Sequence, residues 1–281
     1  MRVFVIGATG VLGRNVIPRL LERGHEVRAV VRQPEQAERL QRLGVRAALG
    51  DILDADSLTA PLIGCDAVLH LATAIPRSQR PEDWLRNDEI RRDGTRNLLA
   101  AARRAGAGRY VQQSITFLYG DRGMRLADED TPLQPAGRTQ SAADMEELVR
   151  GAGLEWSILR GGALYGPHTG AEQGWREGIL DRSLRLPGEG TGLVSLIHEV
   201  DFARALVLAA EAAPPCSVFN VVDDEPVTYR QLYGHVAALL NADVPEAGGP
   251  EIRSLGCSNA RLKEHLGWTP AFPSYRSGIV A

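Results

Sequence analysis

Three features of the 281-residue sequence predict an α/β fold in which a doubly wound parallel sheet carries helices on both faces. Apolar, strand-like runs alternate with amphipathic, helix-like stretches through the first half of the chain. The first of these runs leads into a turn with regularly spaced glycines. Beyond residue 160 the alternation breaks, and Gly and Pro become frequent. Strand–helix alternation of this length implies right-handed crossovers, which bury a parallel sheet between two layers of helices.

The strand-like runs of the first part are short, apolar and separated by helical patterns. They are residues 2–6, 26–31, 45–49, 66–72, 109–114 and 154–160. Amphipathic stretches at 13–24, 91–106 and 141–153 predict helices between them. Most neighbouring strands are therefore expected to be joined by a crossover rather than by a hairpin.

The turn "GATGVLG" follows the first strand and opens a helix. Its glycines permit a tight turn, close approach of the backbone to a pyrophosphate, and close packing of helix on strand. The start of the helix offers free N–H groups and a positive dipole end to the anion. The pattern predicts a Rossmann-type dinucleotide site, held by Gly7, Thr9, Gly10, Val11, Leu12, Gly13 and Arg14.

The residue at the end of the second strand distinguishes the two nicotinamide cofactors. An acidic residue there would bind the ribose 2′-hydroxyl of NAD. This chain has Arg32 at that point, and the first acid downstream is Glu35. Because guanidinium groups at Arg14 and Arg32 suit a 2′-phosphate, NADP(H) is favoured over NAD(H). The alternative is that both are exposed arginines of an arginine-rich chain.

The second part of the chain differs from the first. Residues 161–195 predict long loops with one or two short helices, and four further segments predict a helix, a strand and two helices, namely 202–213, 217–222, 229–241 and 259–267. We therefore divide the chain into a dinucleotide-binding Rossmann-type domain at 1–160 and a small, mainly substrate-binding C-terminal lobe at 161–281. Some segments of the lobe are expected to return to the sheet.

Composition limits the partners that the chain is expected to have. With 32 basic and 35 acidic residues the net charge is −3, so no nucleic-acid-binding field is expected. No apolar run approaches the roughly 20 residues of a membrane span. The three cysteines form no Cys-x-x-Cys pair and the histidines are dispersed, which predicts no metal site. The chain enters its first strand directly after Met1, and we expect a cytoplasmic protein.

The order of motifs resembles the extended short-chain dehydrogenases/reductases of the NAD-dependent epimerase/dehydratase type. The motifs that carry the resemblance are "GATGVLG", "GDILDADSL", "VLHLAT", "DGTRNLLAAA", "SITFLYGD", "LRGGALYGP", "LIHEVDFARALVLA", "FNVVDDEPVTYRQL" and "LKEHLGWTP". The resemblance implies that Asp51 and Ile52 flank the adenine and that Ala72 and Thr73 line the path to the nicotinamide ribose. It also implies that Arg160 and Gly161 lie near the nicotinamide. A homodimer through the helices at about 85–105 and 138–152 is a further expectation from it.

One part of the family's pattern is missing. The family uses a Tyr and a Lys four residues later as the acid–base pair, yet the only lysine here is Lys263, and Asn259 stands four residues before it. At the start of the helix before the sixth strand, Arg138 or Thr139 stands in place of the Tyr. Ala142 or Ala143 stands in place of the Lys. We therefore expect an enzyme with a non-standard active site.

Three other residues are candidates for catalysis. Ser114 lies near the family's hydroxyl position, where it could orient a carbonyl, although capping a backbone group is the simpler role. Tyr165 and His168 follow the sixth strand, at the sheet edge where ligands collect, and either could donate a proton. The alternatives are packing for Tyr165 and plain loop exposure for His168. His198 is expected to position the following helix, with Asp201 as its cap.

These observations favour an NADPH-dependent oxidoreductase that acts on a carbonyl or enone of a small organic metabolite. Trp84 and Trp175 could contribute to a mostly apolar substrate pocket. One alternative is an isomerase, lyase or cyclase that keeps the scaffold without net redox chemistry. Another is a dinucleotide-sensing binding protein that turns nothing over.

Overall fold

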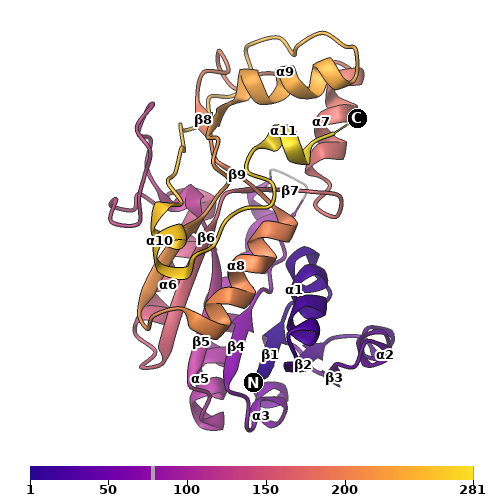
Figure 1. The fold of residues 1–281 in the computed structure, drawn as a ribbon, viewed down its shortest axis with the longest axis vertical. Coiled ribbons are helices and arrows are strands. Elements are labelled where there is room, and N and C mark those ends of the chain that lie inside the picture. The colour runs from indigo at the N-terminus through magenta and orange to yellow at the C-terminus, as the bar shows by residue number, and fades with distance from the viewer. Residues whose placement is uncertain (77–79, 281) are drawn as a thin grey trace. The chain divides into compact units, whose positions relative to one another are not determined.

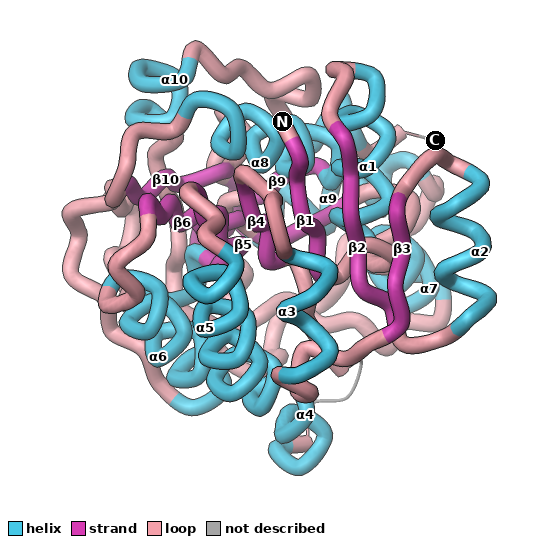
Figure 2. Tube along the Cα trace, turned by 90° about the horizontal axis from the view of Figure 1, so that it is seen from below, coloured by secondary structure: helices cyan, strands magenta, loops and turns pink. Residues whose placement is uncertain are grey.

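The computed structural model describes residues 1–76 and 80–280. Within these residues, seven strands form the central sheet, in the order β10-β6-β5-β4-β1-β2-β3 (Figure 2). The strands are β1 (Arg2–Ile6), β2 (Glu26–Val31), β3 (Arg46–Leu49), β4 (Ala67–His70), β5 (Arg109–Ile115), β6 (Glu155–Gly161) and β10 (Ser217–Val221). The predicted α/β class and the parallel sheet are confirmed.

The winding of the sheet reverses beside β1. This strand pairs in parallel with β2 on one side and with β4 on the other, with Val3 opposite Val27 and Ala67. The chain therefore moves outward from β1 to β3 and then returns to the other side of β1 to form β4. In open α/β sheets, ligands bind at the carboxyl ends of the strands where the winding reverses. Here that point lies between the ends of β1 and β4.

Helices cover both faces of the sheet. The helices of this part are α1 (Val11–Glu22), α2 (Pro34–Arg42), α3 (Asp56–Leu62), α4 (Leu85–Glu89), α5 (Thr95–Ala105), α6 (Gln140–Arg150) and α8 (Glu199–Ala212). Helices α3, α5 and α6 lie side by side on one face (Figure 2). On the other face α8 runs beside α1 (Figure 1), where Arg23 forms an ion pair of 2.6 Å with Glu211.

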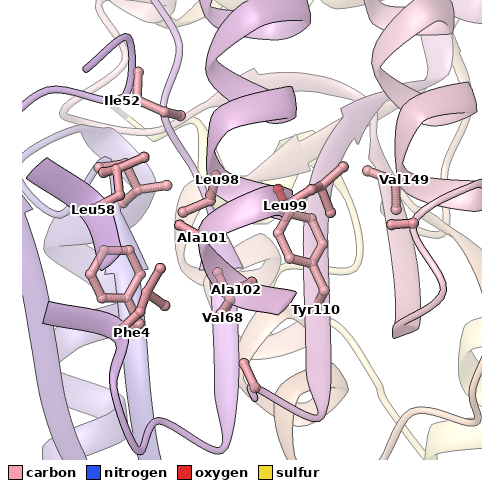
Figure 3. Packing of buried hydrophobic residues seen from close by; sticks show 14 of the residues in the cluster. Phe4, Ile52, Leu58, Val68, Leu98, Leu99, Ala101, Ala102, Tyr110 and Val149 are labelled. Carbon is pink, nitrogen blue, oxygen red and sulfur yellow. The ribbon is translucent and has the colours of Figure 1, made fainter. Parts of the chain in front are cut away.

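The core between the sheet and helices α3, α5 and α6 is built from apolar side chains of both layers (Figure 3). Phe4 and Val68 point from the strands toward Leu58, Leu98 and other helical residues. Several of these side chains are fully buried, and each contributes on the order of 1.5–3 kcal/mol through removal of apolar surface from water. This core holds the strand ends in fixed positions.

The chain divides into two compact units. The first comprises residues 1–114, 136–159 and 203–218, and the second comprises 115–135, 160–202 and 219–281. The remaining elements of the second unit are β7 (Ala163–Tyr165), β8 (Leu193–Val194), β9 (Leu196–His198), β11 (Val227–Thr228), α7 (Ala171–Leu180), α9 (Tyr229–Leu239), α10 (Ala260–Leu266) and α11 (Tyr275–Gly278). Strands β7 and β9 pair in parallel, and β8 and β11 pair antiparallel. The assignment of cofactor binding to 1–160 and of substrate binding to 161–281 stays a prediction.

Two features of the elements differ from the sequence expectations. The helix predicted over 91–106 is interrupted by a π-helical turn at Ile90–Gly94, so that α5 begins at Thr95. The region 161–195, expected to be loops with short helices, also contains β7 and β8. Strands of two or three residues are too short to produce a detectable alternation, which is why the pattern missed them.

Candidate active site

The glycine turn joins the end of β1 to the start of α1, and its geometry explains two of its three glycines. Gly7 has φ +85°, and a Cβ there would lie 2.6 Å from the backbone N of Ala72. A Cβ on Gly13 would lie 2.4 Å from the carbonyl oxygens of Gly7 and Ala8. At Gly10 the corresponding distance, to the Gly7 oxygen, is 3.3 Å. Packing therefore demands glycine at 7 and 13, whereas a Cβ at Gly10 would be close to a single oxygen.

The start of α1 is electrostatically suited to an anion. Gly10 is the N-cap residue, no side chain caps the helix, and its first turn holds no acid. The free N–H groups and the helix dipole present positive potential. Arg14 is exposed, and its Nε donates to the carbonyl oxygen of Thr9 at 3.0 Å, which braces the turn. The residues present therefore fit a dinucleotide pyrophosphate.

Arg32 follows the last residue of β2 and is exposed. Among the described residues its side chain has no hydrogen bond or ion pair. The next acid along the chain, Glu35, lies in the first turn of α2. A guanidinium group therefore stands at the strand end, without a carboxylate partner.

The residues that the resemblance assigns to the adenine and the ribose follow β3 and β4. The Asp51 carboxylate accepts hydrogen bonds from the amide of Leu53 at 3.0 Å and from Arg86 at 3.2 Å. Ile52 is buried in the core. Ala72 is half-buried next to the glycine turn, and Thr73 is exposed. Asp51 is thus fixed in orientation by two donors.

Arg160 and Gly161 lie in the second unit. The Arg160 guanidinium is buried, donates to the hydroxyl of Tyr119 at 2.8 Å and stacks over that ring at 5.1 Å. The Tyr119 hydroxyl in turn donates to Asn220 Oδ1 at 2.8 Å, and burial raises the pKa of Tyr119 to about 12. A Cβ on Gly161 would lie 2.2 Å from the Phe202 ring. Both residues therefore have structural reasons for their identity.

The hydroxyl of Ser114 forms a buried hydrogen bond within the first unit. Its hydroxyl donates to Oε1 of Glu146, on α6, at 2.7 Å. Both side chains are buried. This bond ties the end of β5 to α6, which accounts for a polar residue at this place without catalysis.

Tyr165, the last residue of β7, is fully buried in the core of the second unit. Its ring contacts His198 edge to face at 5.1 Å, and its hydroxyl has no hydrogen-bond partner among the described residues. Burial, with nearby Asp223 and Asp201, raises the pKa of Tyr165 well above its ordinary value. The phenol is therefore neutral across the physiological range.

His168 forms a pair with a buried acid. Its Nδ1 lies 2.5 Å from Oε1 of Glu199, its backbone N–H donates to Oε2 of the same carboxylate, and its side chain is half-exposed. A carboxylate on one ring nitrogen fixes the tautomer and orientation of an imidazole. The other nitrogen, Nε2, then remains available for proton exchange.

The start of α8 corrects one expectation. Asp201 was expected to cap this helix, but it is the third helical residue, and its carboxylate accepts from the amides of Ala271 and Phe272 at 2.8 Å each. The backbone N–H of Val200 instead donates to Nδ1 of His198 at 3.2 Å. His198 thus satisfies an N–H at the helix start, which leaves Asp201 to anchor a distant segment.

The start of α6 holds none of the Tyr and Lys side chains that the resemblance would place there. Arg138 lies over the Trp84 ring at 5.3 Å. The buried Arg91 reaches this point from the π-helical turn and donates to Ser141 Oγ at 3.2 Å. Lys263 lies on α10 and pairs with Asp224 at 2.6 Å. Sequence reasoning missed Arg91, because only the extra residue of the π turn reveals its burial.

Two absences concern the described residues alone. In these parts of the chain no group of three or more His, Cys, Asp or Glu side chains is arranged to hold a metal ion. No helix within the same ranges is long and apolar enough to span a bilayer.

Comparison with known proteins identifies relatives across the whole chain. The family model described as NAD(P)H-binding matches residues 7–179. A 3-diazoavenalumate denitrifying reductase of Streptomyces is 36% identical over 99% of both chains. A 4-hydroxy-2-methyl-3-oxo-4-farnesyl-3,4-dihydroquinoline-1-oxide ketoreductase of Stigmatella aurantiaca is 31% identical, over 99% of this chain and 84% of its own.

Solved structures share the fold. The dTDP-glucose 4,6-dehydratase of Streptomyces venezuelae, determined with NAD bound, superposes with a TM-score of 0.85 at 25% identity, covering 99% of this chain and 94% of that one. The UDP-glucose 4-epimerase of Thermus thermophilus, a complex with NAD, gives 0.81 at 25% identity, covering 99% and 96%. Together with the named reductases, these likenesses support an NAD(P)-dependent oxidoreductase.

Proposed function

This chain belongs to the NAD(P)H-binding family, within the extended short-chain dehydrogenases/reductases, and we propose that it reduces a carbonyl or enone of a small organic metabolite with NADPH. The observation that carries the cofactor choice is Arg32, an exposed guanidinium without a partner among the described residues, directly after β2. The substrate class is supported by the ketoreductase relative. Solved relatives hold NAD, so the proposed preference for NADPH rests on this chain's own residues alone.

The roles proposed for the cofactor-binding residues are those that the glycine turn and the family resemblance imply. The Gly7–Gly13 turn and the start of α1 hold the pyrophosphate, and Arg32 with Arg14 holds the 2′-phosphate. Asp51 and Ile52 flank the adenine, Ala72 and Thr73 line the path to the ribose, and Arg160 and Gly161 lie by the nicotinamide. Bound NADPH supplies a hydride at its nicotinamide ring.

A carbonyl that accepts a hydride also needs one proton on its oxygen. Of the three candidates, Ser114 is engaged by Glu146, and Tyr165 is fully buried. The His168–Glu199 pair combines a fixed tautomer with a half-exposed ring, which is the arrangement of a general acid. We therefore propose that His168 donates this proton to the carbonyl oxygen.

A second candidate function is the reductive removal of nitrogen from a diazo compound, favoured by the likeness to the denitrifying reductase over nearly all of both chains. Addition of a hydride to the terminal nitrogen of a diazonium group gives R–N=N–H, which loses N2 and leaves R–H. These two reaction steps consume no proton from the protein or the solvent. A site without the Tyr–Lys acid pair is compatible with it.

The experiment follows deuterium from NADPH deuterated at the transferred position into product. The probes are 4-nitroacetophenone for carbonyl reduction, because its alcohol product keeps the transferred deuterium on carbon, and 4-hydroxybenzenediazonium for loss of N2. We expect either deuterium on the carbinol carbon of the alcohol or oxidation of NADPH that keeps pace with the release of N2. We also expect His168→Gln to lower carbonyl turnover by about 100-fold while leaving cofactor affinity unchanged. Ser114→Ala and Tyr165→Phe, as matched removals of a hydroxyl, are expected to have smaller effects.

The outcomes separate the competing functions. Product without deuterium and without consumption of NADPH would indicate the isomerase, lyase or cyclase chemistry and contradict a reductase. Tight binding of NADPH with no turnover of any probe would favour a dinucleotide sensor. If His168→Gln keeps full carbonyl turnover while Tyr165→Phe does not, the proton comes from Tyr165.

A further inference from the structure

Several N–H donors on the segment before α5 have no acceptor among the described residues. Trp84 Nε1 and Asn87 Nδ2 are buried without a hydrogen-bond partner. Asn87 is completely buried, and its Oδ1 already accepts the amide of Ala74 at 3.0 Å, which fixes the orientation of the carboxamide. Buried polar groups are nearly always paired, so donors left open in this way require an acceptor from elsewhere.

The guanidinium of Arg91 supplies further N–H donors on the same segment, and its Nε and Nη2 are not among the buried atoms that lack a partner. It follows Asn87 by four residues, which is roughly one turn of the π-helical segment at Ile90–Gly94. Its Nη1 donates to the carbonyl oxygen of Arg138 at 3.3 Å and to Ser141 Oγ at 3.2 Å. No acceptor for its Nε or Nη2 is found among the described residues. Trp84 and Arg91 both reach the start of α6, and Asn87 lies between them along the chain.

The charge at this point is not balanced by a hydrogen-bonded acid. Arg91 is 4% exposed, and burial lowers its pKa to about 10. The negative charge of Asp88 raises this pKa through space, and the positive charge of Arg92 lowers it further. The hydrogen-bond acceptors of Arg91 among the described residues are neutral. The first turn of α6 contains no acid, and its dipole adds positive potential. The nearby Asp88 carboxylate, whose Oδ1 is buried without a hydrogen-bond partner, acts on Arg91 only through space. The guanidinium therefore has no directly bonded carboxylate among the described residues and can bind an anion.

We propose that Trp84, Asn87 and Arg91 form an oxyanion site that binds a negatively charged oxygen of the substrate, such as a phenolate, an enolate or the alkoxide produced by hydride addition. The site lies at the start of α6, where the family resemblance places the missing Tyr and Lys. The identity of the occupant rests on the proposed function. The charged guanidinium stabilises negative charge on oxygen but gives up no proton at neutral pH, so its role differs from that of His168.

The test uses 4-nitrophenol, whose visible absorbance reports its ionisation, titrated into the purified protein alone and with NADP⁺. A fixed cation stabilises the phenolate, so we expect the pKa of the bound probe to fall by about one unit or more. Arg91→Met is expected to weaken phenolate binding at least tenfold. The control is Arg92→Met, which removes a neighbouring arginine that pairs with Asp144 at 2.7 Å, and it is expected to leave the binding unchanged.

Asn87→Asp provides a second variant that a merely structural role would not explain. It places a carboxylate beside Arg91, so it should occupy the site from within, abolish phenolate binding and raise the melting temperature. Arg91→Lys, which keeps the charge without the fork, should restore part of the binding lost in Arg91→Met. The melting temperature of each variant confirms that it is folded.

Three results would overturn this site. The first is an unchanged pKa of 4-nitrophenol on binding to the wild-type protein. The second is phenolate binding by Arg91→Met that is as tight as that of the wild-type protein. The third is an Arg91→Met variant that loses affinity for NADP⁺ but not for the phenolate, which would assign these residues to the cofactor. All three results come from binding measurements, which require no catalytic turnover. Phenolate binding with no reduction of any substrate would keep the oxyanion site and contradict the proposed reductase.

Discussion

At the scale of single residues, the glycines of the turn show how one motif combines packing and binding. A Cβ on Gly13 would lie 2.4 Å from two carbonyl oxygens, so only glycine fits there. A Cβ on Gly10 would lie 3.3 Å from one carbonyl oxygen, which is a weaker restriction. The sequence spacing predicted both without distinguishing them, because the reason for each lies in what surrounds the turn.

Gly13→Ala is expected to destabilise the protein by about 1–3 kcal/mol, since its Cβ forces a backbone shift in a packed turn. NADPH affinity should fall by about tenfold or more, because the shift moves the N–H groups that face the pyrophosphate. Gly174→Ala is the matched control, as Gly174 also lies within a helix and nothing lies within 4 Å of its added Cβ. It should raise stability slightly. Equal melting temperatures for the two variants would argue against the tight packing at Gly13.

Residues that form a site through burial were harder to predict than residues that form a motif. Gly7, Gly10 and Gly13 are recognisable by spacing, and Arg32 by its place after a strand. Asn87 and Arg91 have no such signature, because the π-helical turn at Ile90–Gly94 decides which side chains face inward. Their sequence neighbourhood is rich in charges of both signs and predicts a solvated helix face.

At the scale of elements, the start of α8 depends on contacts that are distant in sequence. Asp201 is completely buried and accepts the amides of Ala271 and Phe272, some seventy residues away. Sequence reasoning assigned it to a local cap because Asp near a helix start is a common capping residue. The ends of strands β1 to β6 were predicted to within two residues, since their apolar runs are continuous.

Asp201→Asn is expected to lower stability by about 1–3 kcal/mol, because the charged acceptor of two backbone amides becomes a neutral one with a single oxygen. Unfolding in urea, followed by circular dichroism, measures the change. Protection of the Ala271 and Phe272 amides from hydrogen exchange should fall together. Unchanged protection of both amides would show that the carboxylate does not hold this segment.

At the scale of the whole molecule, stability should depend on pH through a buried acid. Asp223 is 1% exposed and its Oδ2 has no partner among the described residues. Burial, with the neighbouring acids Glu225, Asp224 and Asp201, raises its pKa to about 8. Because the folded state holds this proton more tightly than the unfolded state, its stabilising effect is complete below the ordinary carboxyl pKa. That effect is lost as the pH rises toward about 8.

Asp223→Asn replaces the protonated acid with a neutral group of the same shape and should flatten this dependence. Between pH 5 and 8 the unfolding free energy of the variant, relative to that of the wild-type protein, should rise by roughly 1.4 kcal/mol for each pH unit. Urea midpoints measured across that range give the difference. Parallel curves for the two proteins would place the pKa of Asp223 near its ordinary value.

Binding of NADPH in preference to NADH is a property of the whole molecule, and equilibrium titration with each cofactor, followed by fluorescence, measures it. The wild-type protein should bind NADPH at least about tenfold more tightly, or by roughly 1.4 kcal/mol. Arg32→Asp should reverse this preference, while Arg39→Asp, an equal change of charge on α2, should keep it. NADH binding as tight as NADPH in the wild-type protein would contradict the role of Arg32, and failure to bind either cofactor would contradict the account of the turn.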